Sequence, residues 1–189
     1  MTNAYFANPL VFLVDTLLYL YMVVVALRLI MQWAHWEYHN PVVQFIIKLT
    51  QAPVKQLRRV IPAAGRWDTA TLVLLLIVAI VKILAVGLIV GMLPTGVYWL
   101  TLLLAELFKL FVNIFTVSIL IEVILSWVTP AGSYNPVAPL VSRMNAPLLR
   151  PVRRIIPPIA GLDLSALFVL LGLQVLSMLI LPVLVGGPI

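Results

Sequence analysis

Four stretches of the chain are apolar over more than twenty residues each, and this feature decides what the chain can fold into. They cover residues 9–31, 69–92, 97–127 and 164–185. A helix of about 20 residues crosses the ~30 Å hydrocarbon layer of a bilayer, so we predict a transmembrane helix in each stretch. The chain is 63% hydrophobic and 10% charged, whereas soluble domains carry about a quarter charged residues. A soluble fold is therefore excluded.

The first and third stretches have features of their own. Residues 1–8 contain no Lys or Arg, so we expect the first stretch to be a retained helix rather than a signal peptide. The third stretch is longer than a bilayer requires, which predicts a tilted or kinked helix.

Two basic segments between these stretches are copies of each other. The pattern from Asn40 to Asp68 recurs 95 residues later, without a gap, from Asn135 to Asp163. In the first copy polar residues recur every three or four positions, which lays one polar stripe along a helix. The segment is too short and too charged to span a bilayer. We predict amphipathic helices lying in the membrane interface, and we name residues 40–67 and 135–162 the first and second elbow.

Each elbow carries signals for the start of a helix. An asparagine accepts a hydrogen bond from a free N–H group, and the proline after it has no N–H group to satisfy. An aspartate then precedes the next apolar stretch, where its carboxylate complements the helix dipole. The aspartates can also pair with arginines ten residues earlier. These predicted caps are Asn40, Pro41, Asp68, Asn135, Pro136 and Asp163.

Prolines inside the elbows predict interruptions of both helices. We expect Pro53 to break or kink the first helix, because proline lacks the N–H group and clashes with the preceding turn. The second elbow contains Pro139, Pro147 and Pro151, so we expect it to be more broken than the first.

The order of span, elbow and span occurs twice. We therefore predict an all-α membrane protein of two parallel tandem repeats, residues 1–93 and 94–189. Because each repeat crosses the membrane twice, both elbows lie on the same side. Nine of the 12 Lys and Arg lie in the elbows, and with Glu37, Asp68 and Asp163 they leave nine minus three, the whole net charge of +6. The positive-inside rule places the elbows in the cytoplasm of a bacterium, and both termini outside its inner membrane.

Charged residues inside the spans allow two interpretations. Such charges are costly in a bilayer, so they normally face partners or water. One interpretation is ion pairing that fixes the helix bundle. The other is an ion path lined by Lys82, Glu106 and Lys109, with Asp15 near its outer mouth. Arg28 and Glu122 occupy equivalent places in the two repeats, and we predict that they meet across the repeat axis.

The doubled elbow pattern resembles the YggT (YlmG) family of small bacterial and plastid membrane proteins. The resemblance covers nearly the full chain and implies a location and a topology more firmly than a reaction. Family members are linked to osmotic tolerance and ion uptake, to membrane or division-site organisation, and in plastids to cytochrome assembly and nucleoid distribution. The residues that carry it are Gln32-Trp33, Asn40-Pro41, Leu57 to Pro62, Asp68, Ser126-Trp127, Asn135-Pro136, Leu149 to Pro157 and Asp163.

The basic residues of the elbows are the candidate binding site. Guanidinium groups match phosphate oxygens, so we expect contact with anionic phospholipid headgroups or with an acidic segment of a partner. The alternative is that these residues only set the topology. The candidates are Lys48, Lys55, Arg58, Arg59, Arg143, Arg150, Arg153 and Arg154.

Motifs for enzyme chemistry are missing from the sequence. There is no cysteine, and His35 and His39 lack a third metal ligand, so we expect no metal, no cofactor and no enzyme. The leading expectation is a membrane-organising or assembly factor that engages anionic lipid, and with it a membrane-protein partner or a second copy of the chain. The alternative is a channel, transporter or transport accessory in osmotic or ion homeostasis. Direct binding of nucleic acid is not expected.

Overall fold

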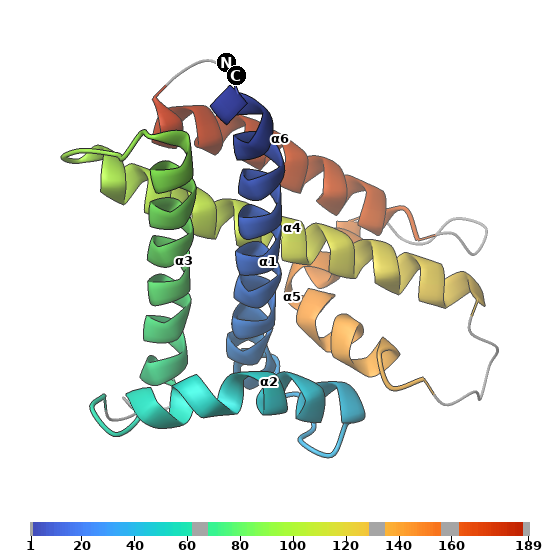
Figure 1. Ribbon diagram of the computed structural model, residues 1–189. Helices are drawn as coiled ribbons and strands as arrows, with labels where there is room; N and C mark the ends of the chain where they lie inside the picture. The colour runs from blue at the N-terminus through green and yellow to red at the C-terminus, as the bar shows by residue number, and fades with distance from the viewer. Residues whose placement is uncertain (1, 62–67, 129–134, 156–162, 187–189) are drawn as a thin grey trace.

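The computed structural model describes residues 2–61, 68–128, 135–155 and 163–186, and those residues form six α-helices (Figure 1). Four of the helices are long and apolar enough to cross a membrane, which confirms the predicted all-α class and its four spans. The helices are α1 (Thr2–Trp33), α2 (Pro41–Leu57), α3 (Thr69–Val90), α4 (Tyr98–Val128), α5 (Ala138–Ile155) and α6 (Ser165–Val185).

The long helices form two pairs. α1 packs mainly against α3, and α4 packs mainly against α6. Figure 1 shows that α1 and α3 run side by side, while α4 and α6 cross this first pair obliquely. Buried apolar side chains hold the first pair together, including Met22 and Val25 of α1 with Leu74 and Val78 of α3. A smaller cluster around Ile119 holds α4 to α5 and α6.

The two short helices, α2 and α5, dock through one apolar face each. α2 lies across the ends of α1 and α3 (Figure 1) and buries Val43, Ile46, Thr50 and Val54. These positions are three or four residues apart, which is one face of an α-helix. α5 packs in the same way against α4 and α6. Its buried residues are Leu140, Val141, Met144, Asn145 and Leu149.

The starts of the two short helices are tied to each other. Asn40 occupies the N-cap of α2 and accepts a 2.9 Å hydrogen bond from the Val42 N–H group. Its side-chain amide also donates to the Pro136 carbonyl at 2.6 Å. The Trp36 indole N–H donates to the Leu140 carbonyl at 3.0 Å. These bonds bring the residues before α2 against the start of α5.

Prolines do not interrupt either short helix, contrary to the predicted breaks. α2 continues through Pro53, and α5 continues through Pro147 and Pro151. An interior proline costs a helix ~3 kcal/mol. Burying one large apolar side chain stabilises by about 1.5–3 kcal/mol. Buried residues lie on both sides of Pro53 and Pro147, and Leu149 is buried two residues before Pro151, so docking outweighs the lost hydrogen bonds. Pro139 lies in the first turn of α5, where proline is tolerated.

Candidate functional site

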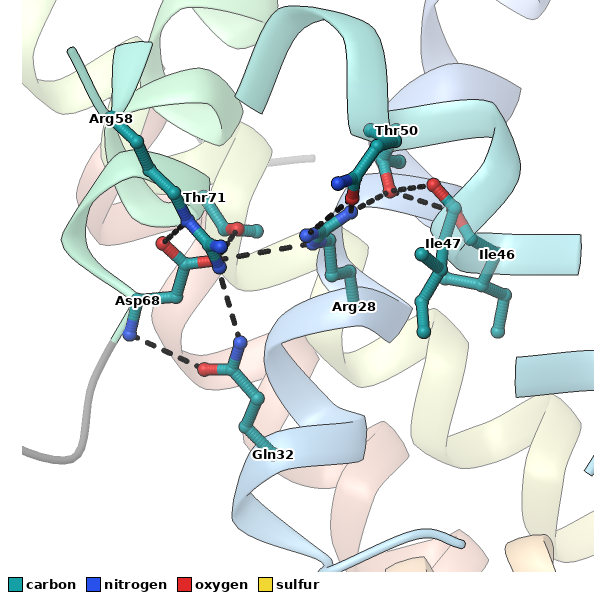
Figure 2. Close-up of polar contacts among 9 residues, drawn as sticks. Arg28, Gln32, Ile46, Ile47, Thr50, Arg58, Asp68 and Thr71 are labelled. Atoms are coloured by element: carbon teal, nitrogen blue, oxygen red, sulfur yellow. Dashed lines mark hydrogen bonds and ion pairs between the residues drawn. The ribbon is translucent and has the colours of Figure 1, made fainter. Parts of the chain in front are cut away.

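Asp68, which directly precedes α3, is the centre of a polar cluster (Figure 2). Its carboxylate accepts hydrogen bonds from the Arg58 guanidinium at 2.5 and 3.3 Å and from the Thr71 hydroxyl at 2.7 Å. The Gln32 side chain of α1 donates to the same carboxylate at 3.5 Å and accepts from the Asp68 backbone N–H at 3.3 Å. Asp68 is therefore bonded to groups from both α1 and the end of α2.

The bonds of Asp68 differ from those of the predicted helix cap. Asp68 occupies the N-cap position of α3, but its side chain makes no hydrogen bond to the N–H groups of the first turn. Burial by itself raises the pKa of Asp68. The hydrogen bonds from Arg58 and Thr71, with the charges of Arg58 and Arg28, outweigh this effect, so the pKa of Asp68 is lowered. Asp68 is therefore an ionised partner of arginines rather than a cap.

Arg28 connects this cluster to the buried face of α2. Arg28 is only 3% exposed, and its guanidinium donates to the Thr50 hydroxyl at 2.7 Å. The Thr50 hydroxyl donates a hydrogen bond to the Ile46 carbonyl at 2.7 Å, so its oxygen can accept from Arg28. The Arg28 Nε atom lies 3.9 Å from the Asp68 carboxylate. A buried cation is thus held between a hydroxyl of α2 and a carboxylate before α3.

The C-terminal half places an anion at the corresponding junction. Glu122 of α4 accepts from the Asn145 side chain of α5 at 2.8 Å and from Arg153 at 3.5 Å. The Ser118 hydroxyl donates to the other end of the buried Asn145 amide at 2.6 Å. Arg153 also donates to Asp163 at 2.7 Å. One arginine of α5 thus bridges two carboxylates.

Asp163 does contribute to the start of the following helix. Its carboxylate accepts a 3.0 Å hydrogen bond from the Ser165 backbone N–H, although Leu164 occupies the N-cap position of α6. Burial raises the pKa of Asp163, but hydrogen bonds from Ser165 and Arg153 outweigh this effect and lower it. Both Arg58–Asp68 and Arg153–Asp163 therefore pair across the expected ten residues.

The predicted contact between Arg28 and Glu122 is not present among the described residues. Arg28 bonds to Thr50 and Gln51, and Glu122 bonds to Asn145 and Arg153. The physical reason is the docking of the short helices. α2 packs on α1 and α5 packs on α4, so each charge finds a partner within its own half.

A third cluster lies between three of the long helices. Lys82 of α3 is buried, and its ammonium lies 2.7 Å from Glu106 of α4 and 3.1 Å from Asp15 of α1. It also stands 5.3 Å from the centre of the Tyr19 ring. A cavity of about 240 Å³ is lined by all three charged residues. This arrangement is an interhelical ion pairing, which is one of the two interpretations that the sequence allows for the charges inside the spans; the other is an ion path.

Lys109 does not join that cluster. Its side chain is exposed and has no ion pair within the part of the chain that the structure describes. It is also absent from the cavity lining, where Asp15 lies instead. The structure thus brings Lys82, Glu106 and Asp15 together and leaves Lys109 out of the predicted path.

The eight candidate basic residues are all exposed, and they divide into two groups, while Arg66, the ninth basic residue of the elbows, lies outside the described residues. Three of them form ion pairs with carboxylates. Arg58 pairs with Asp68, and Arg143 pairs with Glu37 at 2.6 Å. Arg153 pairs with both Asp163 and Glu122. The other five have no ion pair or hydrogen bond with any described residue, and we name them the free basic set. They are Lys48, Lys55, Arg59, Arg150 and Arg154.

Several residues of these clusters were not predicted from the sequence. Thr50 and Asn145 are the important ones, because each is fully buried and binds a charge in a long helix. A signal was available, since the two stand 95 residues apart and so align in the two copies. Each is a polar residue in the middle of an apolar helix face.

Among the described residues, no three His, Cys, Asp or Glu gather as metal ligands.

Four long apolar helices with charges paired between them define a multi-pass helical membrane protein. The chain belongs to the CCB3/YggT family, whose sequence model matches residues 7–89 and 101–184. The protein of Escherichia coli printed as "Uncharacterized protein YggT" is 39% identical over 171 residues, which cover 90% of this chain and 88% of that protein.

Relatives in other bacteria match over a similar length. An uncharacterized protein of Pseudomonas aeruginosa is 38% identical over 174 residues, 90% of this chain and 87% of its own. One from Haemophilus influenzae is 30% identical over 173 residues, 92% of both chains. No solved structure matches the chain.

Proposed function

We propose that this protein is a non-enzymatic organising or assembly factor of the bacterial inner membrane. It gathers anionic phospholipid at its two basic elbows and presents this surface to a membrane-protein partner. In this proposal the elbows face the cytoplasm and both termini lie outside. The charge distribution supports that orientation, because the elbows together with the flanking residues Glu37, Asp68 and Asp163 hold the whole net charge of +6.

The free basic set is the observation that carries the proposal. Five exposed cationic side chains on or next to α2 and α5 have no partner among the described residues. Hydrogen bonds tie the starts of those two helices together, and the five charges lie along the middle and at the C-terminal ends of α2 and α5. A basic residue near an anionic leaflet contributes about 1 kcal/mol of attraction. Residues needed only for packing would instead be paired, as Arg58 and Arg153 are.

The test measures enrichment of anionic lipid around the protein. The chain has no cysteine, so Gln56→Cys at an exposed position of α2 gives a single site for a dye. Energy transfer to labelled phosphatidylglycerol and to labelled phosphatidylcholine is compared in mixed vesicles. Replacing the free basic set by Gln should bring the two signals to the same level.

The matched control removes a paired arginine without changing the net charge. Arg153→Gln combined with Asp163→Asn deletes an ion pair, and this variant should keep the preference for phosphatidylglycerol. The proposal fails if the free basic set can be replaced with no change in lipid preference or in the proteins that copurify.

The Lys82 cluster favours a second candidate function, transport or a supporting role in ion homeostasis. One buried lysine between two carboxylates beside a cavity is a site where an ion or proton could exchange. Lys82→Met with Glu106→Leu and Asp15→Asn removes the whole cluster, so that no charge in a span loses its partner. Transport predicts lost ion flux in proteoliposomes with lipid preference intact. Unchanged flux in the folded variant rejects this candidate.

A further inference from the structure

We propose that the end of α1 holds a specific binding site for one anionic glycerophospholipid. The phosphate lies between Arg143 and Arg150 of α5, and an acyl chain lies in an apolar cavity between α1, α3 and α4. This inference rests on the proposed function, because Arg150 belongs to the free basic set. It adds a defined place and a single occupant to a surface that otherwise attracts lipid diffusely.

The polar part of the site is a cavity of about 530 Å³. The end of α1 and the turn after it line one side with Trp33, Ala34 and His35, and α5 lines the other. Arg143 and Arg150 stand seven residues apart, so their side chains leave the same face of α5 about two turns, ~10 Å, apart. Two guanidinium groups therefore border one cavity.

The two arginines have different roles in this cavity. Arg143 is fixed in place, because it donates to the His35 carbonyl at 2.9 Å and to Glu37 at 2.6 Å. Those two bonds use only part of its five N–H donors. Arg150 is exposed and has no partner among the described residues. Since Glu37 balances Arg143, the cavity retains about one positive charge, which matches one phosphodiester.

The apolar part of the site is a second cavity, of about 320 Å³. Its lining contains no charged residue and comes from Leu29 and Ile30 of α1, Leu72 of α3, and Phe111 and Phe115 of α4. A hydrocarbon chain can make dispersion contacts with this lining, which is the interaction that holds apolar groups together within a bilayer.

Trp33 joins the two cavities, because its side chain lines both of them. Trp33 is also the last residue of α1, and tryptophan favours the boundary between hydrocarbon and headgroups. The apolar cavity lies on the side of the preceding turn, and the cationic cavity lies on the side of α5. This order of an apolar cavity, an interfacial indole and a cationic cavity fits the order of chain, glycerol and phosphate in a phospholipid.

The test uses the full chain in detergent, stripped of lipid, and titrates it with soluble ligands. The ligands are dihexanoyl phosphatidylglycerol, dihexanoyl phosphatidylcholine and glycerol phosphate. Arg150→Gln removes the free cation, and Leu72→Trp fills the apolar cavity at a position that is already 50% exposed. Arg154→Gln is the matched control, because Arg154 also belongs to α5, has no partner among the described residues and does not line the cavity.

The expected result is one phosphatidylglycerol per chain, bound more tightly than either other ligand. Arg150→Gln should weaken binding about tenfold, which is the loss of one hydrogen bond to a charged group. Leu72→Trp should weaken it by a similar factor, whereas Arg154→Gln should change it less than about twofold.

Three results would overturn the site. Equal losses from Arg150→Gln and Arg154→Gln mean diffuse attraction, so the specific site fails while the proposed function stands. Glycerol phosphate binding as tightly as the lipid, with Leu72→Trp silent, means a phosphate site without an acyl chain. If the whole free basic set can be replaced without loss of phosphatidylglycerol binding, the site and the proposed function both fail.

Discussion

The two halves of the molecule place charges of opposite sign at the junction between a long helix and the short helix that packs on it. Where a long helix meets its short helix, the N-terminal half buries the cation Arg28 beside Thr50. The C-terminal half places the anion Glu122 beside Asn145. Thr50 and Asn145 stand at equivalent positions, and each supplies what its charge needs: an acceptor for the guanidinium and a donor for the carboxylate.

The two junctions also differ in burial. The side chains of Arg28 and Asp68 are each 4% exposed, whereas Glu122 is 17% exposed and Asp163 is 34% exposed. Charges interact more strongly where water is excluded, and a buried charge that loses its partner is costly. Equivalent residues in the two halves therefore contribute unequally to the stability of the fold, and the N-terminal junction is more sensitive to the loss of a charge.

The largest expected effect separates the two aspartates. Asp68→Asn leaves Arg28 buried without a counter-charge and should destabilise the protein by about 3–5 kcal/mol. Asp163→Asn breaks a pair of half-exposed groups and should cost about 0–1 kcal/mol. Thermal or denaturant unfolding in detergent measures both. Equal losses would show that the two junctions do not differ as their burial indicates.

A smaller difference is expected for the two buried polar partners. Thr50→Val keeps the side-chain shape but removes the closest acceptor of Arg28, and should cost about 1.5–3 kcal/mol. Asn145→Leu should cost about 1 kcal/mol, because the partly exposed Glu122 retains Arg153 and can be hydrated. The same unfolding measurement applies. A larger loss at Asn145 than at Thr50 would reverse the comparison.

Neighbouring arginines at the end of α2 should differ by less again. Arg58→Gln removes the partner of Asp68, and should cost about 1 kcal/mol because Arg58 itself is half-exposed. Arg59→Gln removes a residue of the free basic set and should stay within about 0.5 kcal/mol of the parent protein. Each change removes one positive charge, so net charge is controlled. Equal destabilisation would contradict the division of the basic residues into two groups.

Lowering the pH should destabilise the folded protein through both aspartates, and little change in stability is expected near neutral pH. The pKa of Asp68 and the pKa of Asp163 are both lowered in the folded protein. Their contribution is therefore fully present above the unfolded aspartate pKa of ~3.9 and is lost as pH falls through the folded pKa. The unfolding temperature should drop below about pH 4, and this drop should be shallower in Asp68→Asn. An unchanged profile would remove Asp68 from the acid response.

Some of the molecule follows from short stretches of sequence. The four apolar helices do so because hydrophobicity and length are local properties, and a bilayer accepts few alternatives. The pairing of Arg58 with Asp68 was also predicted from the sequence, since only ten residues separate the two. The predicted breaks at Pro53 and in the second elbow are wrong, because local propensity yields to the docking of the buried face of each short helix.

Sequence alone determined the family, the four apolar helices and the positions of the basic residues. Only the tertiary structure decided which charges far apart in the sequence meet. It paired Arg28 with Thr50 and Asp68, and it left Arg59 and Arg150 without a partner among the described residues. It also placed Trp33 in the lining of two cavities of opposite character. The physical reason is range. An apolar run acts over its own length, whereas an ion pair or a cavity needs side chains from different helices within a few ångströms, and helix docking sets those distances.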